Sequence, residues 1–151
     1  MNAIKYVHTN LIARDWRKLA DFYITVFNCT PLDPERDLSG DWVDSFTGLA
    51  NAHIRGVHLA LPGWQDGPTL EIFQYEPEAQ GNGLSAINSY GLGHLAFHVD
   101  NVEKVLEMLL VRGGSQIGQL VQKQYPELGL LTAVYARDPE GNIIEIQNWS
   151  K

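Results

Sequence analysis

Short runs along this chain alternate between apolar and polar residues, which is the period expected of β-strands. Between residues 91 and 101, Leu, Phe and Val fall on one side of such a run, while two histidines, His94 and His98, fall on the other. Asp100, with Glu103 three residues later, matches a helix N-cap and its capping box, so a helix is expected next. The stretch therefore predicts a strand that buries one face and shows histidines on the other.

Apolar residues at helical spacing predict further helices. A stripe at i, i+3, i+4 and i+7 follows the N-cap candidate Asp15 and stops near Asn28. A second stripe follows Asp100 and ends at a pair of glycines, as a left-handed C-cap would. A short helix is expected between Gly40 and Gly48. Besides the run within 91–101, period-two runs predict strands at 4–11, 29–32, 57–61, 69–75, 115–121, 130–137 and 143–149.

The two halves of the chain repeat one order of elements: strand, helix, strand, strand, strand. In each half the first strand carries a histidine, His8 or His94. The last strand of each half carries a glutamate near its start, Glu71 or Glu145. We interpret this repeated order as an internal duplication.

The four repeated residues form a candidate site. If the halves pack with pseudo-twofold symmetry, their equivalent histidines and glutamates converge on one point. The period-two rule groups Glu71 with Phe73 and Tyr75 on the side away from the helix, and it groups Glu145 with Trp149 in the same way. Two imidazoles and two carboxylates suit Zn, Ni, Co, Mn or Fe(II). Each residue taken alone reads as structural, but charges in aliphatic strands at matching places favour a metal site.

Length and composition limit the classes of function. A length of 151 residues fits one domain made of two small modules, predicted at 1–80 and 90–151. Eleven basic and 18 acidic residues give a net charge of −7 without a cluster of Lys or Arg, so nucleic acid is not an expected partner. No apolar run approaches the ~20 residues of a membrane helix, and no signal peptide is recognised. The single cysteine, Cys29, fits a cytoplasmic setting.

Several motifs in combination resemble a known family. They are His8, Asp15, Phe22-Tyr23, Thr69-Leu70-Glu71-Ile72, Gly93-His94-Leu95-Ala96-Phe97, Val99-Asp100, Asp138-Pro139-Glu140-Gly141-Asn142 and Ile144-Glu145. Together they resemble the vicinal oxygen chelate superfamily: glyoxalase I, methylmalonyl-CoA epimerase, extradiol dioxygenases, and fosfomycin- and bleomycin-resistance proteins. The resemblance covers essentially the whole chain. It implies an α+β fold of two βαβββ modules with curved mixed sheets around a central divalent metal, a small-molecule substrate and often a homodimer.

Within that superfamily, a His-Glu-His-Glu set resembles bacterial glyoxalase I. The resemblance implies four metal ligands: His8, Glu71, His94 and Glu145. It also implies a lyase or isomerase that removes a proton next to a metal-chelated pair of oxygens, with a thiol adduct of a 2-oxoaldehyde as one candidate substrate. Glu145 is the first choice for the base and Glu71 the second. An Fe(II) extradiol dioxygenase, a metal-free binding or resistance protein and an epimerase of the methylmalonyl-CoA type remain alternatives.

Other residues do not identify the substrate. Members that bind glutathione usually carry an Asn where Tyr75 stands, and glutathione also needs cationic anchors. Phe73, Tyr75 and Trp149 are either apolar walls of a pocket or ordinary core. His98 lies too far along its strand to share the metal, and the segment 119–129 is either a lid or an inert loop. His53 and His58 are expected to be structural or exposed. The candidate anchors are Arg14, Arg17, Arg55, Arg112 and Arg137.

Overall fold

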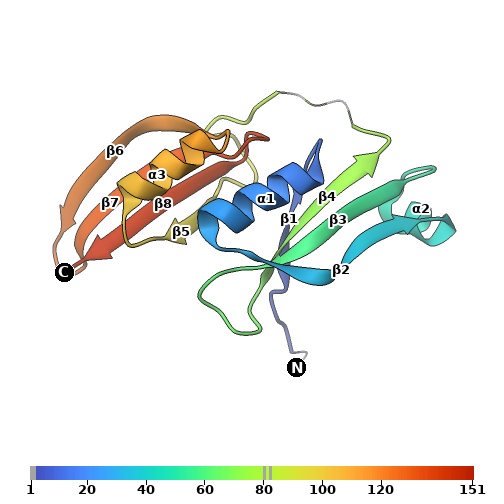
Figure 1. Cartoon of the computed structure of the whole chain (residues 1–151), viewed down its shortest axis with the longest axis horizontal. Coiled ribbons are helices and arrows are strands. Elements are labelled where there is room, and N and C mark those ends of the chain that lie inside the picture. The colour runs from blue at the N-terminus through green and yellow to red at the C-terminus, as the bar shows by residue number, and fades with distance from the viewer. Residues whose placement is uncertain (1–2, 80, 82) are drawn as a thin grey trace. The chain divides into compact units, whose positions relative to one another are not determined.

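The chain forms two compact units, Met1–Gly81 and Asn82–Lys151, each built on its own mixed β-sheet (Figure 1). The computed structural model describes residues 3–79, 81 and 83–151. In these residues each unit has a four-stranded sheet with one parallel and two antiparallel pairings. Helices lie against the sheets, so the predicted α+β fold class is confirmed.

The described part of the first unit follows the predicted order, and the short helix expected between Gly40 and Gly48 is present after the second strand. Its elements are β1 (His8–Ile12), α1 (Trp16–Phe27), β2 (Thr30–Ser39), α2 (Asp41–Thr47), β3 (His53–Ala60) and β4 (Thr69–Glu76). The strands lie in the order β1-β4-β3-β2, and β1 is parallel to β4.

The second unit repeats this topology without the short helix. Its elements are β5 (Leu95–His98), α3 (Val102–Val111), β6 (Ser115–Tyr125), β7 (Gly129–Arg137) and β8 (Ile143–Ser150). The strands lie in the order β5-β8-β7-β6, and β5 is parallel to β8. The equivalent strands therefore occupy equivalent places in both sheets.

The first helix begins and ends where side chains and backbone satisfy its terminal groups. Asp15 has an extended backbone, and its side chain accepts a hydrogen bond from the Lys18 amide. Asn28 adopts a left-handed conformation with φ 55°, and its amide donates to the Tyr23 carbonyl. The predicted helix is confirmed at both ends.

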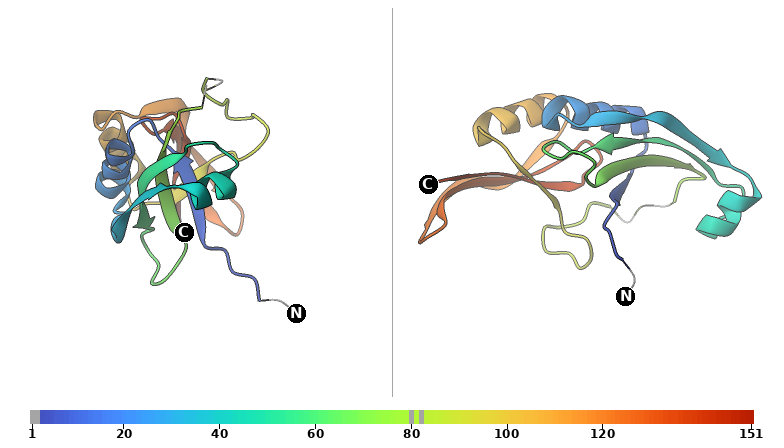
Figure 2. Two further views of the ribbon diagram at one scale, coloured as in Figure 1. Left: turned by 90° about the vertical axis from the view of Figure 1, so that its right-hand side faces the viewer. Right: turned by 90° about the horizontal axis from the view of Figure 1, so that it is seen from below.

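Helices α1 and α2 lie on opposite faces of the first sheet (Figure 2). Strand register puts Leu59 and Ile72 on the face that α1 covers, and both are fully buried. On the other face, Val43 of α2 packs with Ile54 and Phe73 in a small apolar cluster. Burial on both faces stabilises β3 and β4 as the central strands.

The predicted starts of α3, β1 and β5 are wrong. Strand β5 starts at Leu95, so His94, which was expected on this strand, stands one residue before it. Helix α3 is capped by Asn101, whose side chain accepts from the Lys104 amide, and not by Asp100. Both residue types are good N-caps, so the pattern alone could not choose between them. Strand β1 starts at His8 and not at residue 4, because its partner β4 begins at Thr69, opposite His8.

Three other strands are longer than predicted. Strand β2 is an edge strand, where proline is tolerated, and it continues to Ser39 through a register shift between Leu32 and Arg36 that contains Pro34. Strand β3 already begins at His53. Strand β6 continues to Tyr125, and β7 starts at Gly129, so the predicted loop at 119–129 is mostly a β-hairpin.

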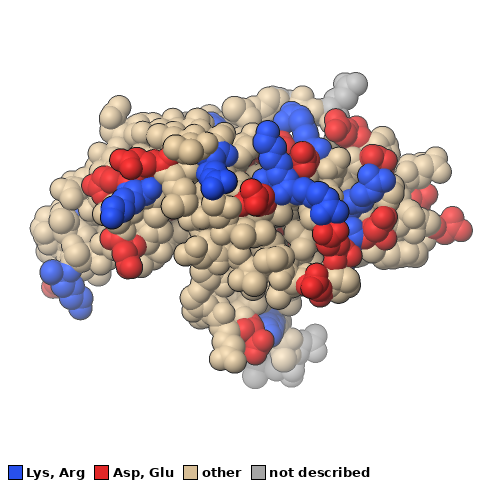
Figure 3. Space-filling model, in the orientation of Figure 1, with Lys and Arg blue, Asp and Glu red and all other residues tan. Residues whose placement is uncertain are grey.

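Charged side chains are mixed on the surface. On the face in Figure 3, Lys and Arg are interspersed with Asp and Glu, as expected for a chain with more acidic than basic residues. Among the described residues, the helices are too short and too polar to cross a membrane.

Candidate metal and catalytic site

Strand register gathers polar side chains on the face of the first sheet that α1 does not cover. Parallel pairing sets Asn10 beside Glu71, and His8 lies two residues earlier on the same face of β1. Antiparallel pairing sets His58 of β3 directly opposite Glu71 from the other side. Glu71 therefore lies between two strands that both present nitrogen donors.

Short contacts hold the Glu71 carboxylate from both sides. Its Oε1 accepts a 2.7 Å hydrogen bond from Asn10 Nδ2, and its Oε2 lies 2.7 Å from His58 Nε2. His8 Nε2 is 3.6 Å from Oε1. The Glu71 side chain is 12% exposed, so these partners replace most of the water that a carboxylate would otherwise bind.

The His58 ring is oriented through its other nitrogen. Its Nδ1 lies 3.1 Å from Thr69 Oγ1, while its Nε2 points at Glu71. Burial lowers the pKa of His58, against the opposing effect of the Glu71 carboxylate. Arg36 and His8 add to the lowering. The neutral imidazole that this shift favours is the form in which histidine binds metals.

A second His–Glu pair occupies the matching place in the second unit. His94 Nε2 lies 3.2 Å from Glu145 Oε2, and Gln147 Nε2 donates a longer hydrogen bond of 3.4 Å to Oε1. Tyr135 of β7 pairs directly with Glu145, and its ring meets the His94 ring edge-on, with centroids 5.1 Å apart. The contacts of Glu145 are thus longer than the closest contacts of the first glutamate.

The two glutamates lie at equivalent register positions but have different neighbours. Opposite the glutamates stand His58 in the first unit and Tyr135 in the second. Beside them stand Asn10 and Ala96. The second unit therefore lacks both the imidazole and the amide that hold the first glutamate at 2.7 Å. The Glu145 carboxylate therefore has fewer close donors than the Glu71 carboxylate.

A family profile described as "Glyoxalase/Bleomycin resistance protein/Dioxygenase superfamily" matches residues 5–146. The chain belongs to this superfamily. Its members typically act on or bind small molecules, are often dimeric and typically use divalent metals. The superfamily contains enzymes as well as proteins without enzymatic activity.

Solved structures of superfamily proteins share the fold. A glyoxalase family protein from Bacillus cereus is 16% identical, with a TM-score of 0.85 over 100% of this chain and 97% of that one. A glyoxylase/bleomycin resistance protein/dioxygenase domain from Frankia sp. is 19% identical, with a TM-score of 0.61 over 99% and 100% of the two chains. The fosfomycin resistance protein FosX of Listeria monocytogenes is 18% identical, with a TM-score of 0.58 over 99% and 95%. No curated protein matches significantly.

Each predicted His–Glu pair of this superfamily member is close within its own unit: His8 with Glu71, and His94 with Glu145. The joint four-ligand set stays a prediction. His98, expected to be no ligand, is exposed at the end of β5.

The three predicted pocket residues lie in different surroundings. Phe73 is buried in the apolar cluster with α2, and Tyr75 packs against that cluster, which favours the reading of both as core. Trp149 is partly exposed near the end of β8, where its ring lies 5.4 Å from that of Tyr125 and its Nε1 donates to Gln147.

Sequence reasoning missed the role of His58, which it assigned to the structural or exposed histidines, and of Asn10. The sequence does contain a feature that predicts where His58 lies. The turn-rich segment 62–68 joins β3 to β4, and a hairpin in which Ala60 faces Thr69 also sets His58 opposite Glu71. Alternation within a strand predicts only the face of a side chain, whereas the register between two strands determines which residue lies opposite it.

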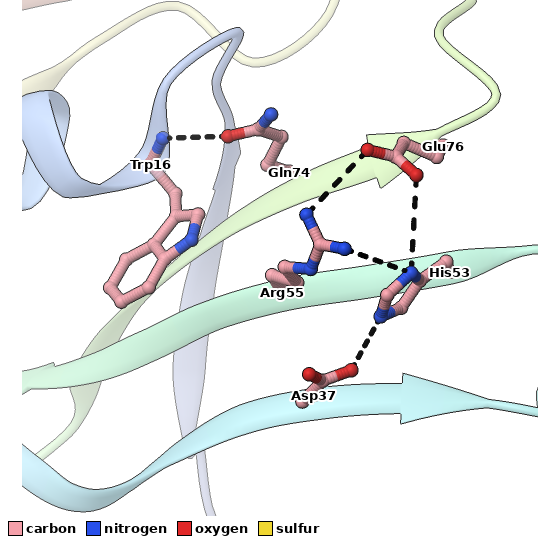
Figure 4. A network of polar contacts seen from close by, with 6 residues as sticks. All are labelled: Trp16, Asp37, His53, Arg55, Gln74 and Glu76. Atoms are coloured by element: carbon pink, nitrogen blue, oxygen red, sulfur yellow. Dashed lines mark hydrogen bonds and ion pairs between the residues drawn. The ribbon is translucent and has the colours of Figure 1, made fainter.

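A separate polar network covers the opposite face of the first sheet (Figure 4). His53 contacts Asp37 on β2 through Nε2, and its Nδ1 lies 3.9 Å from Glu76 Oε2 on β4. Arg55 reaches both Glu76, at 3.6 Å, and His53, at 3.4 Å. This network ties three strands together, and the structural expectation for His53 agrees with it.

Three of the candidate glutathione anchors have partners within the protein. Arg17 makes a two-pronged ion pair with Glu35 at 2.9 and 3.0 Å, which raises its pKa. Arg55 belongs to the network in Figure 4. Arg137 donates to the carbonyls of Gly141 and Ser85, within the second unit. These contacts engage the three arginines within the fold.

The residues around Glu71 fit a divalent metal. His8, His58 and Glu71 each offer one ligand atom, and these three atoms lie within 4.8 Å of one another. Two imidazole nitrogens and a carboxylate oxygen form a donor set that Zn²⁺, Fe²⁺, Co²⁺ and Ni²⁺ accept.

Proposed function

We propose that this chain is a metal-dependent lyase or isomerase of the glyoxalase type, which moves a proton between adjacent carbon atoms of a small molecule. The observation that carries the proposal is the repeated His–Glu pair. Its glutamates stand at the same register position of both sheets, and Glu71 lies on the face of the first sheet away from α1. Membership of the superfamily supports the same reading.

The proposed metal ligands are His8, Glu71, His94 and Glu145. When bound, a divalent ion supplies Lewis acidity toward oxygen atoms of the substrate. The role of Glu71 is to hold the ion, because Asn10 and a histidine already fix both of its oxygens in place.

The proposed base is Glu145. Its closest donors are His94 at 3.2 Å and Gln147 at 3.4 Å, which leaves lone pairs free to accept a proton. It takes the proton from a carbon atom next to two adjacent substrate oxygens and returns it to the neighbouring carbon, so that no atom is gained or lost. Glu71 remains the second choice.

A thiol adduct of a 2-oxoaldehyde is the candidate substrate class, since it carries two adjacent oxygens and an acidic C–H bond. A cytoplasmic setting, where small thiols are reduced, and a homodimer complete the proposal. The buried free thiol of Cys29 is compatible with that setting.

The test compares Glu145→Gln with wild type on the adduct of methylglyoxal and glutathione. We expect kcat to fall by about 10²- to 10⁴-fold while the bound metal is retained, because glutamine cannot accept the proton. Glu107→Gln, on the exposed side of α3, is the matched control and should keep wild-type activity. Equal turnover by Glu145→Gln and wild type would refute the role of this residue as the base.

A second candidate, a metal-free small-molecule binding protein, is favoured by one observation. Each oxygen of the Glu71 carboxylate already has a polar partner within the protein, Asn10 for Oε1 and His58 for Oε2, and so needs no cation. Chelation distinguishes the two functions. A metalloprotein loses about 2.7 kcal/mol of stability when metal at 100 times its Kd is removed, whereas a metal-free protein keeps its melting temperature.

A further inference from the structure

His58 contacts the first His–Glu pair, and the four-ligand set gives it no part. Its Nε2 lies 2.7 Å from Glu71 Oε2, and its ring meets the His8 ring edge-on with centroids 5.5 Å apart. We propose that His58 is itself a metal ligand, so that His8, His58 and Glu71 form a divalent-metal site complete within the first unit. The inference rests on the proposed function only in requiring that the chain binds a metal.

The spacing of the three donors is close to that of a coordinated set. Ligands about 2.1 Å from a zinc-like ion lie about 3.0 to 3.5 Å from one another. His58 Nε2 lies 2.7 Å from Oε2 of Glu71, and His8 Nε2 lies 3.6 Å from Oε1, so each oxygen of the carboxylate faces one imidazole at close to that spacing. All three donor atoms lie within 4.8 Å of one another. Small side-chain shifts, without a change of strand register, would therefore admit an ion.

The orientation of His58 is that of a metal-binding histidine. In most such sites the second ring nitrogen is held by a hydrogen bond, which fixes the ring and its tautomer. Thr69 Oγ1, 3.1 Å from Nδ1, serves this purpose. A hydroxyl both donates and accepts, so Thr69 can hold His58 with the proton on either nitrogen. The ring can thus offer a free Nε2 lone pair to a metal without losing its support.

The second unit has no equivalent of this third ligand. Tyr135 stands where His58 stands in the first unit, and Ala96 stands in place of Asn10. Two imidazoles and one carboxylate hold an ion with positions left for substrate or water, whereas one imidazole and one carboxylate hold it weakly. The structure thus assigns metal retention to the first unit.

The experiment measures Co²⁺ affinity in the full chain by competition with a chromophoric chelator. The background is the double variant His94→Ala/Glu145→Gln, which removes both candidate ligands of the second unit. We expect this variant to bind one Co²⁺ and the further change His58→Gln to weaken binding by at least about tenfold. His53→Gln is the matched control, because it changes a histidine on the same strand but on the opposite face.

A second variant tests direct ligation of the metal by residue 58, and its expected result is a new absorption band and not a loss of affinity. His58→Cys should bind Co²⁺ and give a thiolate-to-cobalt charge-transfer band that wild type lacks, since the native Cys29 is buried. Circular dichroism verifies that each variant is folded.

Two results would overturn the inference. One is a folded His58→Gln variant that binds Co²⁺ as tightly as its parent or more tightly, which would make His58 a competitor of the metal for Glu71. The other is a double variant that binds no Co²⁺. Both are affinity results, so they are separate from the loss of turnover that tests Glu145 as the base.

Discussion

Cys29 illustrates, at the scale of one residue, how burial fixes the chemistry of a side chain. Its thiol is 3% exposed, and burial raises its pKa to about 12. A raised pKa keeps the thiol protonated, so the reactive thiolate is nearly absent at pH 8. We expect a disulfide reagent such as DTNB to label the native protein at least about 100-fold more slowly than the protein in denaturant. Equal rates in the two states would show that this residue is not buried in solution.

Residue types and the repeated order of elements were enough to single out His8, Glu71, His94 and Glu145 as candidates. In the structure each histidine lies near the glutamate of its own unit, and the joint site stays a prediction. Residue types and the order of elements were not enough to find His58. A histidine in an apolar strand has many structural uses, and only its register against Glu71 distinguishes it from His53. The face on which a side chain lies follows from the alternation within its own strand. The residue that it faces on the neighbouring strand depends on the pairing register, which is set by the turn that joins the two strands.

At the scale of elements, Gly56 shows how closely β3 and β4 approach beside the site. A Cβ atom there would lie 2.0 Å from the Ile72 carbonyl oxygen and 2.6 Å from Phe73 Cδ1. Gly56→Ala should destabilise the fold by about 1 to 3 kcal/mol, as overpacking does. Because Gly56 lies on the same face as His58, it should also weaken metal binding.

Urea denaturation measures this effect, and Gly81→Ala is the control because a Cβ there meets open space. Equal stability of Gly56→Ala and wild type would mean that the two strands separate more easily than their packing indicates.

Elements with strong local signals were predicted well. Helix α1 has a capping aspartate and a left-handed asparagine at its ends, and both act as expected. Strand β2 was predicted too short, because a register shift between Leu32 and Arg36 interrupts its alternation. Strand β6 was also predicted too short, although its regular pairing with β7 continues from Val121 to Tyr125. An edge strand buries little on either side, so its sequence carries a weaker period than that of a central strand.

At the scale of the whole molecule, the sequence predicted that the two halves repeat one order of elements, and the two sheets have equivalent strand orders. The chemical difference between the units was not predictable from that order. The first unit surrounds its glutamate with an amide and two imidazoles, and the second presents one imidazole, a phenol and a more distant amide. This asymmetry is the basis for assigning metal retention to Glu71 and proton transfer to Glu145.

The central claim is that these side chains bind a divalent metal, and metal content measures it directly. The protein is reconstituted with Zn²⁺, Ni²⁺ or Co²⁺ and dialysed against metal-free buffer. Its metal content is then measured by inductively coupled plasma mass spectrometry. We predict one ion per chain for wild type and for Glu76→Gln, a carboxylate on the opposite face of β4. For Glu71→Gln we predict at least about tenfold weaker retention. Folded wild-type protein that retains none of the three metals would contradict the account.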